Sequence, residues 1–289
     1  MTARIPASSE RLERATRKLT ALSVTAYANP HGRFCWTSSA STERPAMSER
    51  LLPLAGLPVF GQLSDEQRWR LALLEAVSFF SLNISGEREL MAGLTRRLGE
   101  GRPAFLSRYL RHFLEEENAH TVVFARFCLD YGGAIFADRQ VRFPREFLPG
   151  EEEFLFFARV LVFEEIAHFY NRSIATDEDV WSLAREINRY HAEEETRHLA
   201  FGRLLVAELW ERLSPAWDGE GKRRIGQYLT LYVTTVLQSY VNPEVYRAIG
   251  LPAGTRQQIL QSPHWISLAD QSTGRITRWL QKLGVTGHA

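Results

Sequence analysis

The stretch His191-Ala-Glu-Glu-Glu195-Thr-Arg-His198 decides the fold of this 289-residue chain, because it lies in a helical pattern and carries metal-type ligands. Residues three and four apart share one face of an α-helix, so His191, Glu195 and His198 point the same way. Two imidazoles and a carboxylate on one face suit a transition metal better than a packed core or a hydrated surface. The motif therefore predicts a metal site on a helix.

A second half of this motif lies upstream, at Glu117-Asn118-Ala119-His120. Two E-x-x-H pairs on separate helices, with one glutamate from each of two further helices, are the ligands of a carboxylate-bridged di-iron helical bundle. A single E-x-x-H is a weak signal, because surface helices often carry Glu and His by chance, whereas the combination is specific. No H-E-x-x-H occurs and the set is rich in carboxylates, which argues against a zinc protease.

Helical periodicity dominates the chain, and no strand-like alternation of useful length is present. Ser64 to Gln67 reads as a capping box that starts a long helix, and the acidic residues 177–179 suit a helix N-terminus. We expect a single all-α domain, in which residues 1–61 form an N-terminal helix and an extended arm packed on a bundle at 62–289. The expected helices lie at about 8–28, 64–94, 104–131, 151–174, 177–213, 221–239, 243–249, 256–261 and 265–283.

The first long helix must supply one carboxylate. We select among its glutamates by asking which one lies on the same face as the apolar stripe of the helix. Glu87 is in phase with the apolar stripe; Glu89 lies about half a turn away and ranks second, and Glu75 ranks third. On the third long helix, Glu164 fits the apolar phase better than Glu165. Glu165, however, forms a third E-x-x-H with His168, so this choice stays open. The apolar residues that define the two phases are Val77, Phe80, Ile84 and Met91, and Phe157, Val160 and Leu161.

Composition excludes several other classes of protein. Lys plus Arg (35) nearly cancels Asp plus Glu (34), which gives no support to binding of nucleic acid or of an anionic membrane surface. The two cysteines, Cys35 and Cys128, have no C-x-x-C partner, so neither a disulfide framework nor a zinc ribbon is indicated. The N-terminus lacks the apolar run of a signal peptide, and no stretch is apolar enough to span a bilayer. We expect a cytoplasmic protein without membrane partners.

These residues resemble the ferritin-like di-iron oxygenase family typified by p-aminobenzoate N-oxygenase, which is related to ribonucleotide reductase. In that family the last ligand helix carries an extra histidine, which gives H-x-x-x-E-x-x-H, and His191 is in that position here. The resemblance covers roughly residues 30–255. It implies a ferritin-like bundle with extra N- and C-terminal helices and two iron ions. The ligands that it implies are Glu87, Glu117, His120, Glu164, His191, Glu195 and His198.

The resemblance also implies an activity. Members oxidise aryl amines to hydroxylamine, nitroso or nitro groups, often in natural-product pathways, through a peroxo-di-iron(III) species formed from two Fe(II) and O₂. No flavin, nicotinamide or iron–sulfur motif occurs in the chain, so electrons must come from a separate reductase or a small reductant. The implied partners are a small-molecule amine and a second copy of the chain in a homodimer. Its candidate interface is the N-terminal arm or the apolar helix around Leu229–Leu237.

Other interpretations share the same ligands. One is a di-iron C–H hydroxylase or desaturase that acts on a small or carrier-bound substrate. Another is a non-enzymatic ferritin-like iron protein, which the N-terminal arm and the helical C-terminal third argue against. A manganese-containing centre is a further alternative, because the same ligands bind both metals. Arg197, within the motif, either orients a carboxylate or lies on a solvated face.

Overall fold

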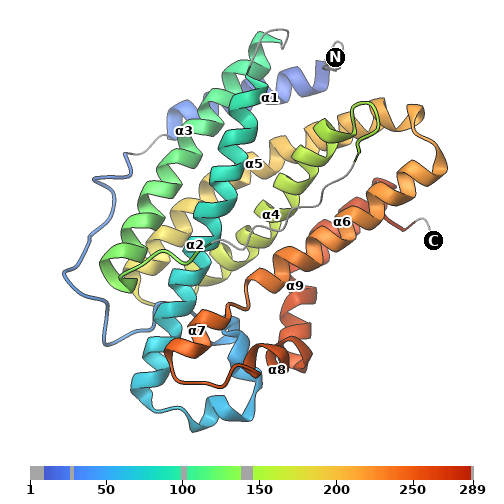
Figure 1. Ribbon diagram of the computed structural model, residues 1–289. Coiled ribbons are helices and arrows are strands. Elements are labelled where there is room, and N and C mark those ends of the chain that lie inside the picture. Colours follow the sequence, from blue (N-terminus) through green and yellow to red (C-terminus); the bar gives the residue numbers. More distant parts are fainter. Residues whose placement is uncertain (1–9, 27–28, 99–102, 138–145, 288–289) are drawn as a thin grey trace.

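The computed structural model describes residues 10–26, 29–98, 103–137 and 146–287 (Figure 1). All regular elements among these residues are helical, which confirms the expected all-α class. Most helix boundaries fall within three residues of the expected positions. The helices are α1 (Glu10–Ala26), α2 (Asp65–Arg97), α3 (Ala104–Phe127), α4 (Glu151–Ala175), α5 (Ser182–Leu213), α6 (Gly219–Ser239), α7 (Pro243–Ala248), α8 (Thr255–Gln261) and α9 (Pro263–Lys282).

Four long helices form the bundle, with α2 packed on α3 and α4 packed on α5. Contacts of α2 with α4 and of α3 with α5 join the two pairs (Figure 1). Helix α1 lies against α3 and α5, whereas α6 and α9 both pack on α4. The inner faces of the four long helices thus enclose a common interior, while α1, α6 and α9 cover the outside.

The expected capping box starts α2. The Ser64 hydroxyl accepts a hydrogen bond from the Gln67 amide at 3.2 Å, and the Gln67 side chain accepts one from the Ser64 amide at 3.0 Å. Two amides that would otherwise lack a partner in the first helical turn are satisfied in this way. At its C-terminal end, α3 continues into a π-helical turn at Cys128–Gly132. Gly133, with a positive φ of 74°, ends this turn.

The acidic segment 177–179 does not start the fourth long helix, contrary to expectation. Helix α5 begins at Ser182, and Asp177 instead accepts a hydrogen bond from the Ser48 hydroxyl of the arm. The Trp181 amide donates to the Pro45 carbonyl at 2.8 Å. Pairing with the arm therefore competes with helix initiation, and the helix starts later.

The arm before α2 contributes to the main core. It contains three short 3₁₀ turns, at Glu49–Leu51, Pro53–Gly56 and Pro58–Gln62. The second turn packs against α8 and α9. Apolar side chains along the whole arm are buried in the same cluster as those of the bundle, among them Phe34, Met47, Leu52, Leu54 and Phe60. Within the described ranges, no helix has both the length and the apolar character needed to cross a membrane.

Two glycines let α4 approach α2 closely. A Cβ on Gly86 would lie 2.4 Å from Cε1 of Phe163, and one on Gly93 would lie 2.0 Å from Cε2 of Phe156. Both distances are far below van der Waals contact, so larger side chains at these positions would push the helices apart. Glu87 lies between these two glycines on α2.

Candidate metal centre

The structure brings all seven proposed ligands into one buried cluster inside the bundle. Each of them exposes 3% or less of its surface. Burial of so many ionisable groups is costly unless a charge partner compensates it. The cluster consists of Glu87 on α2, Glu117 and His120 on α3, Glu164 on α4, and His191, Glu195 and His198 on α5.

Glu195 lies at the centre of the cluster. Its Oε1 is 3.0 Å from His191 Nε2, 3.2 Å from His198 Nδ1 and 3.7 Å from His120 Nδ1. Glu117 spans two of these imidazoles, with Oε1 2.9 Å from His198 Nδ1 and Oε2 3.5 Å from His120 Nδ1. One carboxylate that reaches two imidazoles through different oxygens has the reach of a bridging ligand.

Glu87 and Glu164 complete two sides of the cluster. Glu87 Oε1 is 3.3 Å from His191 Nε2 and 3.8 Å from His120 Nδ1. Three overlapping groups have donor atoms within 4.8 Å of one another: Glu87 with His120 and His191, Glu117 with His120 and Glu195, and Glu164 with His191 and Glu195. Each group has the composition and spread of a metal-binding site.

Many of the oxygen and nitrogen atoms that could bind a metal have no hydrogen-bond partner. Although the atoms are close, both oxygens of Glu87, both oxygens of Glu117 and Oε2 of Glu195 are buried without one, as are His120 Nδ1 and His191 Nε2. Short contacts without hydrogen-bond geometry mean that the lone pairs of neighbouring groups converge instead of facing donor hydrogens. This arrangement fits cations between the side chains.

The outward nitrogens of two histidines are held by carboxylates from the opposite helix. His120 Nε2 donates to Glu194 Oε2 at 2.8 Å, and His198 Nε2 donates to Glu116 Oε2 at 2.7 Å. A proton on Nε2 leaves the Nδ1 lone pair free and aims it into the cluster. Glu116 and Glu194 were not expected as site residues. Each comes one position before the glutamate of an E-x-x-H pair, which is the only trace of them in the sequence.

Arg197 joins these two outer carboxylates. Its Nη2 lies 2.6 Å from Glu116 Oε1 and 3.5 Å from Glu194 Oε1, and its Nε donates to Ser23 of α1 at 3.2 Å. The first alternative for Arg197, orientation of a carboxylate, is therefore what the structure shows. The third histidine has a different support, since the Asn171 side-chain amide is bonded to His191 Nδ1 at 2.6 Å and leaves Nε2 facing the cluster.

The pKa values of the cluster show how strongly its charges interact. Burial, together with the charge of Glu117, raises the pKa of Glu87 to about 7. Burial and the charge of Glu195 raise the pKa of Glu164 well above its usual value. Burial opposes the ionised form of Glu195 as well, but the charge of His198 and a hydrogen bond from Glu164 outweigh it and lower the pKa.

The histidine pKa values follow the same logic. Burial opposes the charged form of His120, but the close contact with Glu117 and the hydrogen bond to Glu194 raise its pKa well above the usual value. His198 behaves likewise, through Glu195 and Glu117. Without a metal, protons must balance the buried negative charge. Four carboxylates carry four negative charges, which two divalent cations would neutralise while leaving the imidazoles uncharged.

The alternative carboxylates lie elsewhere. Glu89 is exposed on α2, and Glu75 is buried next to Tyr246 of α7. Glu165 forms ion pairs with Arg203 of α5 and, at 3.8 Å, with Arg275 of α9. The structure thus separates Glu87 and Glu164 from the residues that competed with them in the sequence.

Aromatic side chains pack against the imidazoles. The Phe113 ring centre is 3.9 Å from that of His198, and Phe124 lies 4.9 Å from His191. Tyr190 lies 5.4 Å from His120 and is covered in turn by Phe34 of the arm, at 5.6 Å. These rings belong to the main core, and they shield the cluster from water.

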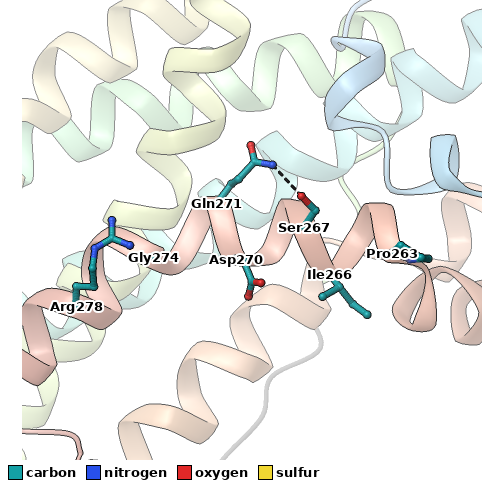
Figure 2. Close-up of a pocket in the computed structure, with 7 residues that line it drawn as sticks. All are labelled: Pro263, Ile266, Ser267, Asp270, Gln271, Gly274 and Arg278. Atoms are coloured by element: carbon teal, nitrogen blue, oxygen red, sulfur yellow. Dashed lines mark hydrogen bonds between the residues drawn. The ribbon is translucent and has the colours of Figure 1, made fainter.

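The most spacious pocket among those described on the surface is separate from this cluster. It has a volume of about 650 Å³ and is lined by seven residues of α9 alone, from Pro263 to Arg278 (Figure 2). Its one internal hydrogen bond in this view runs from Gln271 to Ser267 at 3.1 Å. Since a single helix forms the whole lining, it is a shallow surface hollow, and none of the clustered Glu and His residues lines it.

Comparison with known proteins identifies the family. The family model of the p-aminobenzoate N-oxygenase AurF matches residues 9–284. Among solved structures, two tyrosine-to-phenylalanine variants of R2-like ligand-binding oxidases, each reconstituted with a Mn/Fe cofactor, have the same fold. Their TM-scores are 0.51 and 0.50, with 15% sequence identity and 95% of this chain and 94% of each of theirs covered. Curated protein sequences give no match. The expected ferritin-like fold is confirmed, and the chain belongs to the p-aminobenzoate N-oxygenase AurF family of di-iron oxygenases.

Proposed function

We propose that this chain is an O₂-dependent, non-haem di-iron oxygenase that oxidises the nitrogen of an aryl amine to a hydroxylamine, nitroso or nitro group. The observation that carries the proposal is the convergence of unpartnered carboxylate and imidazole lone pairs in the bundle of an AurF-family chain. The first oxidation combines the amine, O₂, two electrons and two protons into a hydroxylamine and water.

In this proposal two iron ions are held by Glu87, Glu117, His120, Glu164, His191, Glu195 and His198. Bound there, the metal pair would supply the reduction of O₂ and the transfer of one oxygen atom to the substrate nitrogen. Glu117 and Glu195, which each approach more than one imidazole, are the carboxylates placed to reach both metal positions. Carboxylates and imidazoles of this kind also suit manganese, so the metal identity must be measured.

The surrounding residues hold the ligands and keep water out. Glu116, Glu194 and Asn171 fix the orientation of the three imidazoles, so that little reorganisation accompanies the reaction. The aromatic shell of Phe113, Phe124 and related rings excludes solvent, which protects reactive oxygen species from quenching. Electrons would come from a separate reductase or a small reductant, and we propose that the protein acts as a homodimer.

The decisive experiment measures metal content and products together. Purified protein loaded with Fe(II) is given O₂, a reductant and p-aminobenzoate or another aryl amine, and ¹⁸O₂ traces the oxygen. We expect about two metal ions per chain and one ¹⁸O atom on nitrogen in the hydroxylamine product. Binding of two irons and consumption of O₂ without any N-oxidised product from a panel of amines would exclude the N-oxygenase. Absence of metal binding in a folded protein would exclude the whole proposal.

Matched variants test the ligand assignment. Glu87→Gln should lower the metal content, whereas Glu89→Gln, on the same helix but exposed, should not. Glu164→Gln and Glu165→Gln form a second pair, of which only the first should impair metal binding. Loss of metal with Glu89→Gln but not with Glu87→Gln would show that the assignment on α2 is wrong.

A further inference from the structure

Glu75 is a buried carboxylate that the proposed function does not use. It lies on α2, twelve residues before Glu87, which corresponds to about 18 Å along the helix. Its residue surface is 3% exposed, and Tyr246 of α7 is the neighbour that acts most strongly on its charge. A carboxyl group so deep in a protein needs partners, and most of those near Glu75 are phenols.

A small cavity lies at this carboxyl group. Its volume is about 10 Å³, and its polar lining consists of Glu75, Tyr170 and Tyr240. The apolar lining comes from α2 and the arm, namely Phe79, Leu82, Met47, Leu51 and Pro53. A cavity of this size accommodates one water-sized molecule and nothing larger.

The oxygens around the cavity have unused hydrogen-bonding capacity. Glu75 Oε1 and the hydroxyls of Tyr170 and Tyr240 are buried without a hydrogen-bond partner, as is the hydroxyl of the neighbouring Tyr246. The rings of Tyr170 and Tyr240 are stacked with centres 4.6 Å apart, and both residues line the cavity. Leaving three buried oxygens unpaired would cost about 1–3 kcal/mol for each.

We propose that Glu75, Tyr170 and Tyr240 form a binding site for one internal water molecule at the junction of the arm, α2, α4 and the α6–α7 corner. A water with three polar partners is the usual occupant of such a buried site. The volume excludes larger ligands, and the three oxygens supply both donors and acceptors.

Burial is the main reason that Glu75 is a neutral acid. It raises the pKa of Glu75 to about 8, against a smaller opposite effect of the neighbouring Tyr246. Burial also keeps the phenols of Tyr170, Tyr240 and Tyr246 protonated. The other charged groups are more remote: Glu164 acts on Tyr240 from the metal side, and Arg256 acts on Tyr246.

The water site would join segments that are distant in the sequence. Tyr170 belongs to α4, Tyr240 caps the end of α6, and the apolar wall includes residues 47–53 of the arm. Nearby, Asn242 donates to Ser78 of α2 at 3.2 Å, so this corner is already fixed to the bundle by direct bonds. The bound water would link α2, α4 and the end of α6 next to the arm residues that line the cavity.

The first test is a crystal structure of the metal-loaded protein at a resolution that shows ordered water. We expect one water within hydrogen-bond distance of Glu75 Oε1 and of both tyrosine hydroxyls. A cavity without density, or closed by direct Glu75–tyrosine bonds, would overturn the proposal. The outcome is independent of the proposed oxygenase activity, because no metal ligand takes part.

The second test follows the pH dependence of stability in the wild type, Glu75→Gln and Glu66→Gln, an exposed control on the same helix. Because the pKa of Glu75 is higher in the folded state, its contribution is complete below about pH 4.5 and decreases as the pH rises to about 8. The unfolding constant of the wild type, relative to Glu75→Gln, should therefore increase by more than tenfold between pH 5 and pH 8. A pH-independent ratio would overturn the neutral acid.

A double-mutant cycle tests the shared water even if Glu75→Gln does not fold. Tyr170→Phe and Tyr240→Phe each remove one hydroxyl while keeping the stacked rings. If both hydroxyls bind the same water, the second substitution should cost clearly less than the first, as neither tyrosine bonds the other directly. Strict additivity of the two effects would show that no water connects them.

Discussion

Replacement of Arg197 by glutamine should weaken both the fold and the metal site. Arg197 is the common partner of Glu116 and Glu194, two carboxylates that expose 4% or less of their residue surface. Without the guanidinium, both carboxylates remain buried and lose the positive charge that they share. Lysine would be a poor substitute, because a single ammonium does not reproduce a planar guanidinium whose Nη2 faces both carboxylates while its Nε donates to Ser23.

The pKa of Glu116 sets the size of the effect. Burial opposes its ionised form, but hydrogen bonds and charge from His198 and Arg197 lower the pKa from 4.5 to about 2. That difference corresponds to about 3 kcal/mol of stabilisation of the ionised form. Part of this stabilisation comes from Arg197 and part from His198. Breaking a buried ion pair costs about 3–5 kcal/mol where no other partner remains. We therefore expect Arg197→Gln to lose about 2–3 kcal/mol of unfolding free energy.

The metal site should weaken for a separate reason. Because Glu116 and Glu194 hold the outward nitrogens of His198 and His120, their misplacement lets both imidazoles rotate. Loss of such outer support typically lowers metal affinity by about 10–100-fold. Chemical denaturation of the metal-free protein measures the first effect, and titration with Fe(II) or Mn(II) measures the second.

Arg203→Gln is the matched control for this prediction. Arg203 lies on the same helix and pairs with the buried Glu165, but no imidazole of the cluster depends on that pair. The control should lose stability and keep its metal affinity. If Arg197→Gln and Arg203→Gln changed metal affinity equally, or if Arg197→Gln changed neither quantity, the assigned role of Arg197 would be wrong.

Three further predictions follow from the same geometry. Glu195→Ala should abolish binding of the metal pair in a metal assay, since Oε1 of Glu195 approaches all three imidazoles, and retention of two ions would contradict its central position. Metal affinity should fall as the pH decreases below about 7, because the Glu87 carboxyl must lose its proton to bind, and titrations at pH 6 and pH 8 test this. Gly93→Ala should cost about 1–3 kcal/mol, since its Cβ would overlap the Phe156 ring, whereas Gly61→Ala, with no atom within 4 Å, should be nearly neutral in denaturation.

Much of the site was predictable, because helical periodicity converts sequence spacing into direction. The relation of His191, Glu195 and His198 depends only on the 3.6-residue turn, and so does the pairing of Glu117 with His120. The apolar phase of a helix then separates inward from outward positions, which favoured Glu87 over Glu89 and Glu164 over Glu165. The structure places the favoured residue of each pair in the cluster.

The errors and omissions have a common cause, which is contact between segments distant in the chain. The late start of α5 reflects pairing of Asp177 and Trp181 with the arm, and no local signal in residues 177–181 reveals that pairing. The cross-helix bonds of Glu116 to His198 and of Glu194 to His120 likewise depend on how α3 and α5 face each other. A run of three glutamates does not show which member turns inward and which binds a histidine of another helix.

The sequence alone determined that the chain is helical, which faces are apolar, and which glutamates and histidines share a face, since these are properties of one helix at a time. Only the tertiary structure decided which helix faces met, how closely α4 could approach α2 at Gly86 and Gly93, and which buried carboxylates were left with converging lone pairs. It also assigned Glu75 to a phenol-lined cavity and not to the metal cluster. The physical reason is that burial and charge balance depend on distances between helices, and those distances follow from the packing of the whole bundle.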